Sequence, residues 1–320
     1  MKKGITVIVC TYNGALRLPD TLKYLAAQEV SDNLEWEILL ADNASTDHSA
    51  EIAAAYWNEH NIKNVPLTLI QESTPGKLYA LQKGIALAKY EYFIICDDDN
   101  WLDSKYVQTA FDILDENDDI GALGGQAKAA TGNSGLPEWF EPVQEGYAIG
   151  TQSKNTGDVT FKGRLWGAGL SSRTQLYLDA YRNFPSLLIN KSDHKILTAE
   201  DTEYCLRLVL KGYKLYYDPR LSLQHYIPEG RLTLTYKNSL FENFRKSNLI
   251  IDNYYLAIKY GPNNKLSLFN KIRLRLITPI RYIFSSSPQK KSRQRRIMCY
   301  LFPFVKPDRI TTQIKAFINN

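Results

Sequence analysis

The chain has 320 residues, of which 44% are hydrophobic and 23% are charged. These proportions are ordinary for a globular protein with a sizeable core, and they do not favour a disordered chain. Because α/β domains of about 200 to 250 residues occur as single units, we expect one large domain with an appendage.

Charge is distributed unevenly along the sequence. The whole chain has a net charge of +5, but the residues from 259 onward contain fourteen lysines or arginines and a single acid, Asp308. This tail therefore carries +13 and the preceding residues carry −8. The sequence predicts an acidic body with a basic tail.

Strands and helices alternate over the first hundred residues. Apolar and β-branched runs predict buried strands at residues 5–10, 36–41, 65–71 and 92–96. Between these runs, the spacing of apolar residues and of helix-capping side chains predicts three helices, at 19–27, from 47 to 56, and at 78–89. Alternation at this spacing implies βαβ units and a mostly parallel sheet with helices on both faces.

The pattern loosens after residue 99. Strand-like pieces occur at 120–123, 165–171 and 214–217, and a Gly- and Ser-rich loop at 129–136 and a polar stretch at 145–163 lie among them. Helices are expected at 198–210 and 236–258. Residues 1–258 contain no linker that would divide them.

The four cysteines, Cys10, Cys96, Cys205 and Cys299, show no CxxC spacing. We expect reduced thiols in a cytosolic protein. The first strand follows the N-terminus directly and is too short for a signal sequence, and no run of about 18 apolar residues predicts a membrane-spanning helix.

Three polar clusters follow predicted strands, at residues 11–13, 42–43 and 97–99. Ligands bind at the carboxyl ends of the strands in such sheets, so these clusters should line one crevice.

Asp97, Asp98 and Asp99 form the strongest chemical signal. Two carboxylates one residue apart at a strand end point the same way and can clamp a hard cation, which neutralises diphosphate oxygens. A solvated acidic turn or helix cap is the alternative. A calcium loop is disfavoured because Trp101 and Leu102 stand where an oxygen ligand and a glycine are needed.

Other polar residues each have a functional and a structural interpretation. Asp42 can accept a hydrogen bond from a base or ribose, or cap the following helix, whereas Asp47 favours capping. Lys77 can contact phosphate as a point charge or be solvated. Glu200 and Asp201 open a helix, where acids are common for dipole reasons alone.

Two further features lie near this acidic pair or downstream of it. The small residues of Trp166-Gly167-Ala168-Gly169 would let a substrate approach the backbone closely. His225 is one of four histidines, and such a residue is more often structural than a ligand.

Taken together, seven segments resemble family 2 glycosyltransferases of the A-type (GT-A) fold, from about residue 5 to residue 231. In chain order they are VCTYN at 9–13, ADNASTD at 41–47, GKLYALQKG at 76–84, CDDDN at 96–100, WGAG at 166–169, AEDTE at 199–203 and HYIPEGR at 225–231. The sequence departs from the family at Asn100, where many relatives have a further acid, and at Gln82, where they often have Asn.

The resemblance implies a Rossmann-like α/β nucleotide-binding fold with a mostly parallel central sheet, followed by a helical basic extension. The catalytic domain would cover residues 1–235, with a nucleotide-sugar half at 1–126 and an acceptor half at 127–235. The extension would cover 236–320.

The resemblance also implies a donor site. Thr11 and Tyr12 would contact the nucleoside, with Asn13 beside them, and Asp42 would contact the base. Lys77 would lie near the diphosphate.

Within the DXD motif, Asp97 and Asp99 would reach the ribose and a Mg²⁺ or Mn²⁺ ion, with Asp98 between them in the donor site. His225 would add a metal or diphosphate contact, and Arg231 would steady the leaving group.

On the acceptor side, Trp166, Gly167, Ala168 and Gly169 would contact the acceptor, and Glu200 would support it. Asp201 would be the general base. Displacement at an anomeric carbon requires a deprotonated acceptor on one face and charge neutralisation of the departing diphosphate on the other, and one such step inverts the stereochemistry.

The expected activity is transfer of a sugar from a UDP-, GDP- or dTDP-sugar to a saccharide or lipid-linked saccharide, in cell-surface polysaccharide or glycoconjugate synthesis. A nucleotidyltransferase is the enzymatic rival, and it would release pyrophosphate. A nucleic-acid-binding protein is the other rival, and the acidic body argues against nucleic acid as a partner.

The basic tail interleaves apolar and basic residues over 265–281. This pattern predicts peripheral contact with an anionic membrane surface, which would be the inner face of the cytoplasmic membrane. Packing of the tail on the catalytic domain is the alternative.

Overall fold

The structure is a computed structural model that describes residues 1–61, 63–133, 135–189, 196–264 and 266–320. Its strands and α-helices are, in chain order, β1 (Lys2–Thr11), α1 (Leu18–Ala26), β2 (Trp36–Asp42), α2 (Ser49–His60), β3 (Leu67–Gln71), α3 (Lys77–Leu87), β4 (Tyr90–Asp97), β5 (Asn100–Leu102), α4 (Tyr106–Glu116), β6 (Ile120–Thr131), β7 (Gly157–Asp158), β8 (Ser171–Arg173), α5 (Thr174–Arg182), α6 (Glu200–Leu210), β9 (Lys214–Ile227), α7 (Leu234–Tyr260), α8 (Leu268–Ile283), α9 (Pro288–Leu301) and α10 (Arg309–Asn319). Short 3₁₀ helices occur at Glu141–Tyr147, Thr160–Lys162 and Glu229–Arg231.

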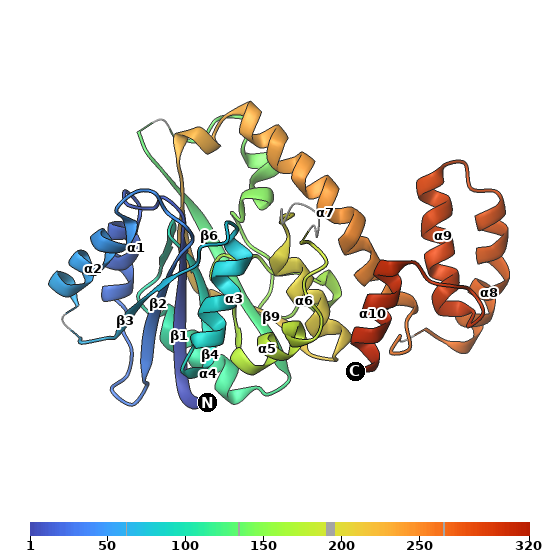
Figure 1. Ribbon diagram of the computed structural model, residues 1–320, viewed down its shortest axis with the longest axis horizontal. Coiled ribbons are helices and arrows are strands. Elements are labelled where there is room, and N and C mark those ends of the chain that lie inside the picture. The colour runs from blue at the N-terminus through green and yellow to red at the C-terminus, as the bar shows by residue number, and fades with distance from the viewer. Residues whose placement is uncertain (62, 134, 190–195, 265) are drawn as a thin grey trace.

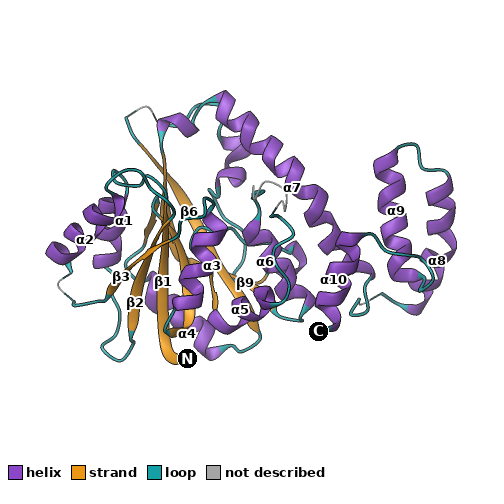
Figure 2. Cartoon of the chain, in the orientation of Figure 1, coloured by secondary structure: helices purple, strands orange, loops and turns teal. Residues whose placement is uncertain are grey.

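A central sheet with helices on both faces organises the chain (Figures 1 and 2). Among the described residues the sheet has nine strands in the order β3-β2-β1-β4-β8-β6-β9-β5, with β7 paired to β9. The first four strands along the chain are parallel, whereas β8 runs antiparallel to both β4 and β6. The expected α/β class with a C-terminal helical part is confirmed, and the sheet is mixed in its second half.

The first strand shows why its sequence is a continuous apolar run. Val7 and Val9 belong to the core that packs against α1, whereas Ile8 and Cys10 belong to the core that packs against α3. Both faces of β1 are therefore buried, and each fully buried side chain of this size contributes about 1.5 to 3 kcal/mol. The strand is thus fixed between two helical layers.

Several expected boundaries differ from those of the structure. The predicted strand at 165–171 is wrong, because Gly169 has a φ of +75° that turns the chain out of the extended conformation, and β8 begins only at Ser171. The predicted loop at 129–136 is partly wrong, because β6 continues through Thr131; residue 134 lies outside the described residues. Helices α4 and α5 and strand β5 were not expected.

The C-terminal helices extend away from the sheet. Thr233 caps helix α7, because its side chain accepts a hydrogen bond from Tyr236 N. Helix α10 packs against α7 in a core that includes Ile251, Ile314 and Phe317. Helices α8 and α9 form a hairpin at the end of the molecule remote from β3 (Figure 1). Residue 265, where the basic segment was expected to start, lies outside the described residues.

Two remaining expectations concern cysteines and membrane spans. All four cysteines are buried free thiols. None of the helices in the described ranges combines the length and the apolar character needed to cross a bilayer.

Candidate active site

The three polar clusters lie at the same edge of the sheet. In the parallel register, Thr11 at the end of β1 stands beside Asp42 of β2, and Cys10 stands beside Asp97 of β4. The carboxyl ends of neighbouring parallel strands meet at one edge, which explains why residues so distant in sequence converge here.

The turn after β1 is tied to the turn after β2. Asn13, with a φ of +49°, accepts a hydrogen bond from Thr46 N at 2.8 Å through Oδ1. Asp42 is buried, and its Oδ1 accepts a hydrogen bond from Ser45 N at 3.1 Å. Tyr12, in the turn after β1, has 58% of its surface exposed.

Asp42 and Asp47 therefore have different structural roles. Helix α2 begins at Ser49, beyond the reach of the Asp42 contacts, and Asp47 Oδ1 accepts the hydrogen bond of Ser49 N at 3.1 Å. Asp47 therefore binds the first backbone N–H group of α2, from the position before the N-cap residue His48. Asp42 binds its own turn and also accepts a hydrogen bond from Gln71 Nε2 of β3 at 3.3 Å.

Asn43 positions the loop that leads to α3. Its Nδ2 donates to the carbonyl oxygen of Thr74 at 2.7 Å, and its Oδ1 accepts from Gly76 N at 2.6 Å. Gly76 has a φ of +131°, which disfavours any other residue at this position. Sequence reasoning missed this function of Asn43, although an amide at a strand end was visible in the second polar cluster.

Lys77, the first residue of α3, connects the end of β4 to the start of α6. Its Nζ atom lies 2.6 Å from Oδ1 and 2.8 Å from Oδ2 of Asp97, and 3.9 Å from Oε1 of Glu200. Burial lowers the pKa of the Lys77 ammonium group, but these two carboxylates more than offset burial and hold the pKa above its ordinary value. Lys77 is therefore a fixed positive charge in the site.

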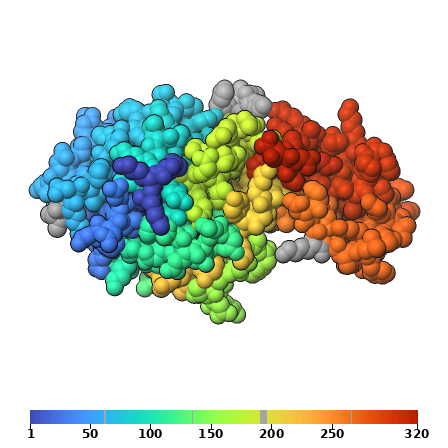
Figure 3. All heavy atoms as spheres, turned by 90° about the horizontal axis from the view of Figure 1, so that it is seen from below, coloured from blue at the N-terminus to red at the C-terminus, as the bar shows by residue number. Residues whose placement is uncertain are grey.

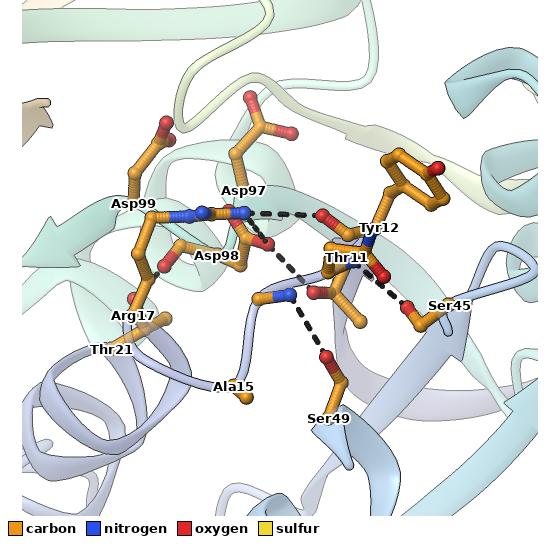
Figure 4. Close-up of polar contacts among 12 residues, drawn as sticks. Thr11, Tyr12, Ala15, Arg17, Thr21, Ser45, Ser49, Asp97, Asp98 and Asp99 are labelled. Atoms are coloured by element: carbon orange, nitrogen blue, oxygen red, sulfur yellow. Dashed lines mark hydrogen bonds and ion pairs between the residues drawn. The ribbon is translucent and has the colours of Figure 1, made fainter. Parts of the chain in front are cut away.

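Asp98 faces the opposite way from its two neighbours (Figure 4). Its carboxylate accepts hydrogen bonds from Thr11 Oγ1 at 2.6 Å and from Arg17 Nε and Nη2 at 2.9 Å and 2.8 Å. Burial raises the pKa of Asp98, and these hydrogen bonds oppose the rise. The contacts join the end of β1, the N-cap residue of α1 and the residue after β4, and Arg17 is a partner that the sequence pattern did not reveal.

Asp99 lies among cationic and imidazole groups. Its Oδ2 accepts a hydrogen bond from Arg231 Nη1 at 2.9 Å, and its Oδ1 lies 3.5 Å from His225 Nε2. Burial raises the pKa of Asp99, but His225 and then Arg231 outweigh burial and lower the pKa to about 2. Asp99 is therefore ionised across the physiological pH range.

Asp201 is held by backbone hydrogen bonds. Its Oδ2 accepts from Gly167 N at 2.8 Å and its Oδ1 from Thr202 N at 2.6 Å. Burial raises the pKa of Asp201 despite these bonds, and burial likewise raises the pKa of Glu200. A carboxylate with a raised pKa and a fixed orientation is suited to accept a proton.

One pocket brings the start of α6 together with α3 and α5. The residues that line it include Lys77, Gly167, Tyr177, Glu200, Asp201 and Tyr204. Asp97 adjoins this pocket through its ion pair with Lys77, and Asp99 lies beyond Asp97 at the same strand end.

Of the segment of small residues at 166–169, Gly167 lines this pocket. Trp166 N donates to Gln152 Oε1 at 2.8 Å, and Tyr106 Oη donates to the carbonyl oxygen of Gly169 at 2.8 Å. A Cβ atom at Gly169 would collide with the Tyr106 hydroxyl group. Ala168 packs against the core on the α1 side of the sheet. Gln152 and Tyr106 therefore fix the backbone of a segment that the sequence indicated only through its glycines.

The donor set near Asp99 fits a divalent cation in part. A carboxylate and an imidazole 3.5 Å apart are ligands that Mn²⁺ accepts, and the buried His225 Nδ1 has no hydrogen-bond partner. Asp97, however, is engaged by Lys77. Within the described ranges, no three His, Cys, Asp or Glu side chains are already grouped as a metal site.

Comparison with known proteins adds a family and a fold. The sequence model of glycosyl transferase family 2 matches residues 6–165, which is half of the chain. A poly-beta-1,6-N-acetyl-D-glucosamine synthase of Staphylococcus epidermidis is 24% identical over 227 residues, covering 71% of this chain and 51% of that protein. The chain spans about half or less of the length of the curated relatives it matches.

Two solved structures resemble the chain over nearly all of its length. Mannosyltransferase PcManGT from Pyrobaculum calidifontis, in complex with GDP-Man and Mn²⁺, has a TM-score of 0.57 and 19% identity, and the match covers 100% of this chain and 86% of that one. S. aureus TarS 1–349, in complex with UDP-GlcNAc, has a TM-score of 0.54 and 20% identity, and the match covers 97% and 83%. At these identities the likeness shows the fold.

Proposed function

Because the chain belongs to glycosyl transferase family 2, we propose that it transfers a sugar from a nucleotide-sugar donor to an acceptor hydroxyl group with inversion. The observation that carries this proposal is the junction of Lys77, Asp97, Glu200 and Asp201. A fixed cation for phosphate and a carboxylate suited to proton abstraction lie together there.

The donor would bind across the three strand ends. Thr11, Tyr12, Asn13 and Asp42 would surround the nucleoside, and the exposed ring of Tyr12 would offer a contact face. Asp98 lies in this region through its hydrogen bond to Thr11 and would support the donor site from behind.

The diphosphate would lie between Lys77 and Arg231. Both side chains are cations beside the DXD carboxylates, and both can stabilise negative charge on the leaving group. Asp99, His225 and Asp97 would hold a Mn²⁺ or Mg²⁺ ion, which supplies further neutralisation of the diphosphate when bound.

Asp201 would act as the general base. As the acceptor oxygen forms a bond to the anomeric carbon, its proton passes to Asp201, and the bond between that carbon and the β-phosphate oxygen breaks with its electron pair leaving on the phosphate. Hydrogen bonds from Gly167 and Thr202 hold the carboxylate in place, and such a base contributes about 10² to 10⁴-fold to the rate.

The acceptor would contact residues 166–169, of which Gly167 lines the pocket, and Glu200 would support its hydroxyl groups. The named relatives include a poly-N-acetylglucosamine synthase, and the structural neighbours bind UDP-GlcNAc and GDP-Man. We therefore propose a UDP- or GDP-sugar donor, with dTDP-sugars as a further class to test. The acceptor would be a saccharide or lipid-linked saccharide in cell-surface polysaccharide synthesis.

We also propose a division of the chain into a catalytic domain and an extension. Residues 1–235 would form the catalytic domain, with the donor half at 1–126 and the acceptor half at 127–235, and residues 236–320 would form a helical, basic C-terminal extension that shares a core with α6. The location would be cytoplasmic, with peripheral contact at the inner face of the cytoplasmic membrane.

A donor screen tests the activity. Purified protein with Mn²⁺ is incubated with a panel of nucleotide sugars, and release of nucleoside diphosphate is measured for each. We expect donor-dependent release with one class of sugar nucleotide. Pyrophosphate release from a nucleoside triphosphate and a sugar phosphate would instead indicate a nucleotidyltransferase and contradict the proposal.

A further inference from the structure

Helix α8 carries an exposed apolar face. Six of its large apolar side chains leave between 51% and 74% of their surface accessible, namely Leu268, Phe269, Ile272, Leu276, Ile280 and Ile283. Most of them follow one another at spacings of three or four residues, so they share one side of the helix. Phe284, directly after the helix, is 80% exposed.

The opposite side of α8 packs on α9. Thr278 is buried there, and Leu274 packs against a core formed by Leu256 of α7 and by Ile297 and Leu301 of α9. Figures 1 and 3 show that this hairpin forms the end of the molecule remote from the N-terminal strands. The apolar face therefore points away from the catalytic body.

The charge of the hairpin is of one sign. Residues 268–301 contain nine lysines and arginines and no acid. Arg273 and Arg281 are exposed on α8, and Lys290, Lys291 and Arg293 are exposed on α9. The hairpin that carries the apolar face is thus strongly basic, and Arg296 is the one of these cations that pairs with an acid in the described residues, Asp308.

The exposed apolar face and the positive charge together indicate which kind of partner could cover α8. A second copy of the hairpin would bring two groups of nine cations together, which is unfavourable. A nucleic acid would use the cations but would leave the apolar face in water. An anionic bilayer accommodates both, because the apolar side chains enter the acyl boundary while the basic groups meet the headgroups.

We propose that α8 is a membrane-binding helix that lies in the plane of an anionic bilayer, with its apolar face inserted. The proposal deepens the peripheral location proposed above by assigning it to one helix face. It does not rest on the sugar-transfer chemistry, because Lys77, Asp201 and the rest of the site belong to other elements.

Vesicle flotation of the full chain tests the proposal. Wild-type protein is mixed with phosphatidylcholine vesicles that contain or lack phosphatidylglycerol, and the floating fraction is measured. We expect flotation with the anionic vesicles. The pair Leu268→Ser and Leu276→Ser should lower partitioning about tenfold or more, because two leucine side chains no longer enter the acyl region.

A matched control removes two exposed leucines elsewhere. Leu87→Ser with Leu249→Ser changes residues that are 55% and 59% exposed on α3 and α7, and this variant should float like wild type. The pair Arg273→Gln and Arg281→Gln should weaken binding to anionic vesicles about tenfold or more while leaving the apolar face intact.

Three results would overturn the proposal. The first is wild-type protein that stays out of the anionic vesicles, and the second is equal flotation of wild type and of the α8 leucine variant. The third is a wild-type dimer, seen by sedimentation, that dissociates in the leucine variant, because a second copy would then cover the face. Nucleoside diphosphate release by each variant on a water-soluble acceptor reports separately on the proposed activity.

Discussion

The Nζ atom of Lys77 lies 2.8 Å from the Oδ2 atom of Asp97. Asp97 ends β4 and Lys77 begins α3, so this ion pair joins the strand end that carries the DXD motif to the helix behind it. Glu200 of α6, 3.9 Å from the same ammonium group, extends the link to the acceptor side. A change at Lys77 should therefore affect both halves of the site.

Lys77→Gln should weaken donor binding about tenfold, which corresponds to about 1.4 kcal/mol. A larger effect is not expected, because the Lys77 side chain is 35% exposed and solvent screens its charge. Isothermal titration with the nucleotide sugar measures the change. Lys83→Gln, on the same helix but paired with Glu72, is the matched control and should keep the wild-type affinity.

Asp98→Ala should lower stability more than donor affinity. Its partner Arg17 would remain partly buried without a counterion, and breaking a buried pair costs about 3 to 5 kcal/mol. Because 24% of the Arg17 side chain is exposed, we expect about 2 to 3 kcal/mol in urea unfolding. A double-mutant cycle with Arg17→Leu isolates the coupling; absence of coupling would contradict the structural role of Asp98.

Removal of a divalent cation should weaken donor binding. Asp99→Asn and His225→Ala should each lower the Mn²⁺ affinity, measured with nucleoside diphosphate present, by about 10- to 100-fold or more. Loss of a residue that merely orients a metal ligand already costs this much, and these two side chains would bind the ion directly. Free Mn²⁺, measured by electron paramagnetic resonance, reports the affinity. Donor binding that is unaffected by a chelator and by both substitutions would show that Lys77 and Arg231 suffice without a metal.

The sequence predicted the first half of the fold well for a physical reason. The strand at 5–10 is apolar on both faces because Val7 and Ile8 enter two different cores, and this signal does not depend on tertiary detail. The rule that ligands bind at strand ends then placed Asp42 and Asp97 at one edge, as the register shows.

The parts that could not be predicted depend on long-range contacts. Arg17 reaches Asp98 across 81 residues, and Gln152 fixes the backbone of Trp166, so neither pairing leaves a local pattern. The strand expected at 165–171 failed because Gly169 has a positive φ, in a turn where the Tyr106 hydroxyl group binds its carbonyl oxygen and leaves no room for a Cβ atom. The local spacing of apolar residues carries no information on such long-range contacts.

Asp201→Asn should keep donor affinity and lose transfer by about 10² to 10⁴-fold, because an amide cannot take the acceptor proton. Burial raises the pKa of Asp201, and the base must be ionised to accept the proton. The transfer rate should therefore begin to fall, as the pH is lowered, at a pH above the pKa of an ordinary aspartate. Nucleoside diphosphate release is followed against pH. Asp179→Asn, on the surface of α5, is the control; full transfer activity of Asp201→Asn would reject the assigned base.

Two glutamates one turn apart on α6 should respond oppositely to neutralisation. Burial raises the pKa of Glu200 above its ordinary 4.5, so the folded protein binds more protons than the unfolded chain between 4.5 and the raised pKa, and stability falls as pH rises through that window. Glu200→Gln should therefore raise the free energy of unfolding at pH 7, and this gain should disappear below pH 4.5.

Glu203 instead accepts hydrogen bonds from Arg207 at 3.0 Å and from Tyr254 at 2.7 Å. The side chains of Glu203 and Arg207 are 0% and 2% exposed. Glu203→Gln leaves the guanidinium group buried without its anion and should cost about 3 to 5 kcal/mol. Urea unfolding of both variants at several pH values separates the two cases, and a loss of stability in Glu200→Gln at pH 7 would show that its link to Lys77 outweighs the cost of burying its charge.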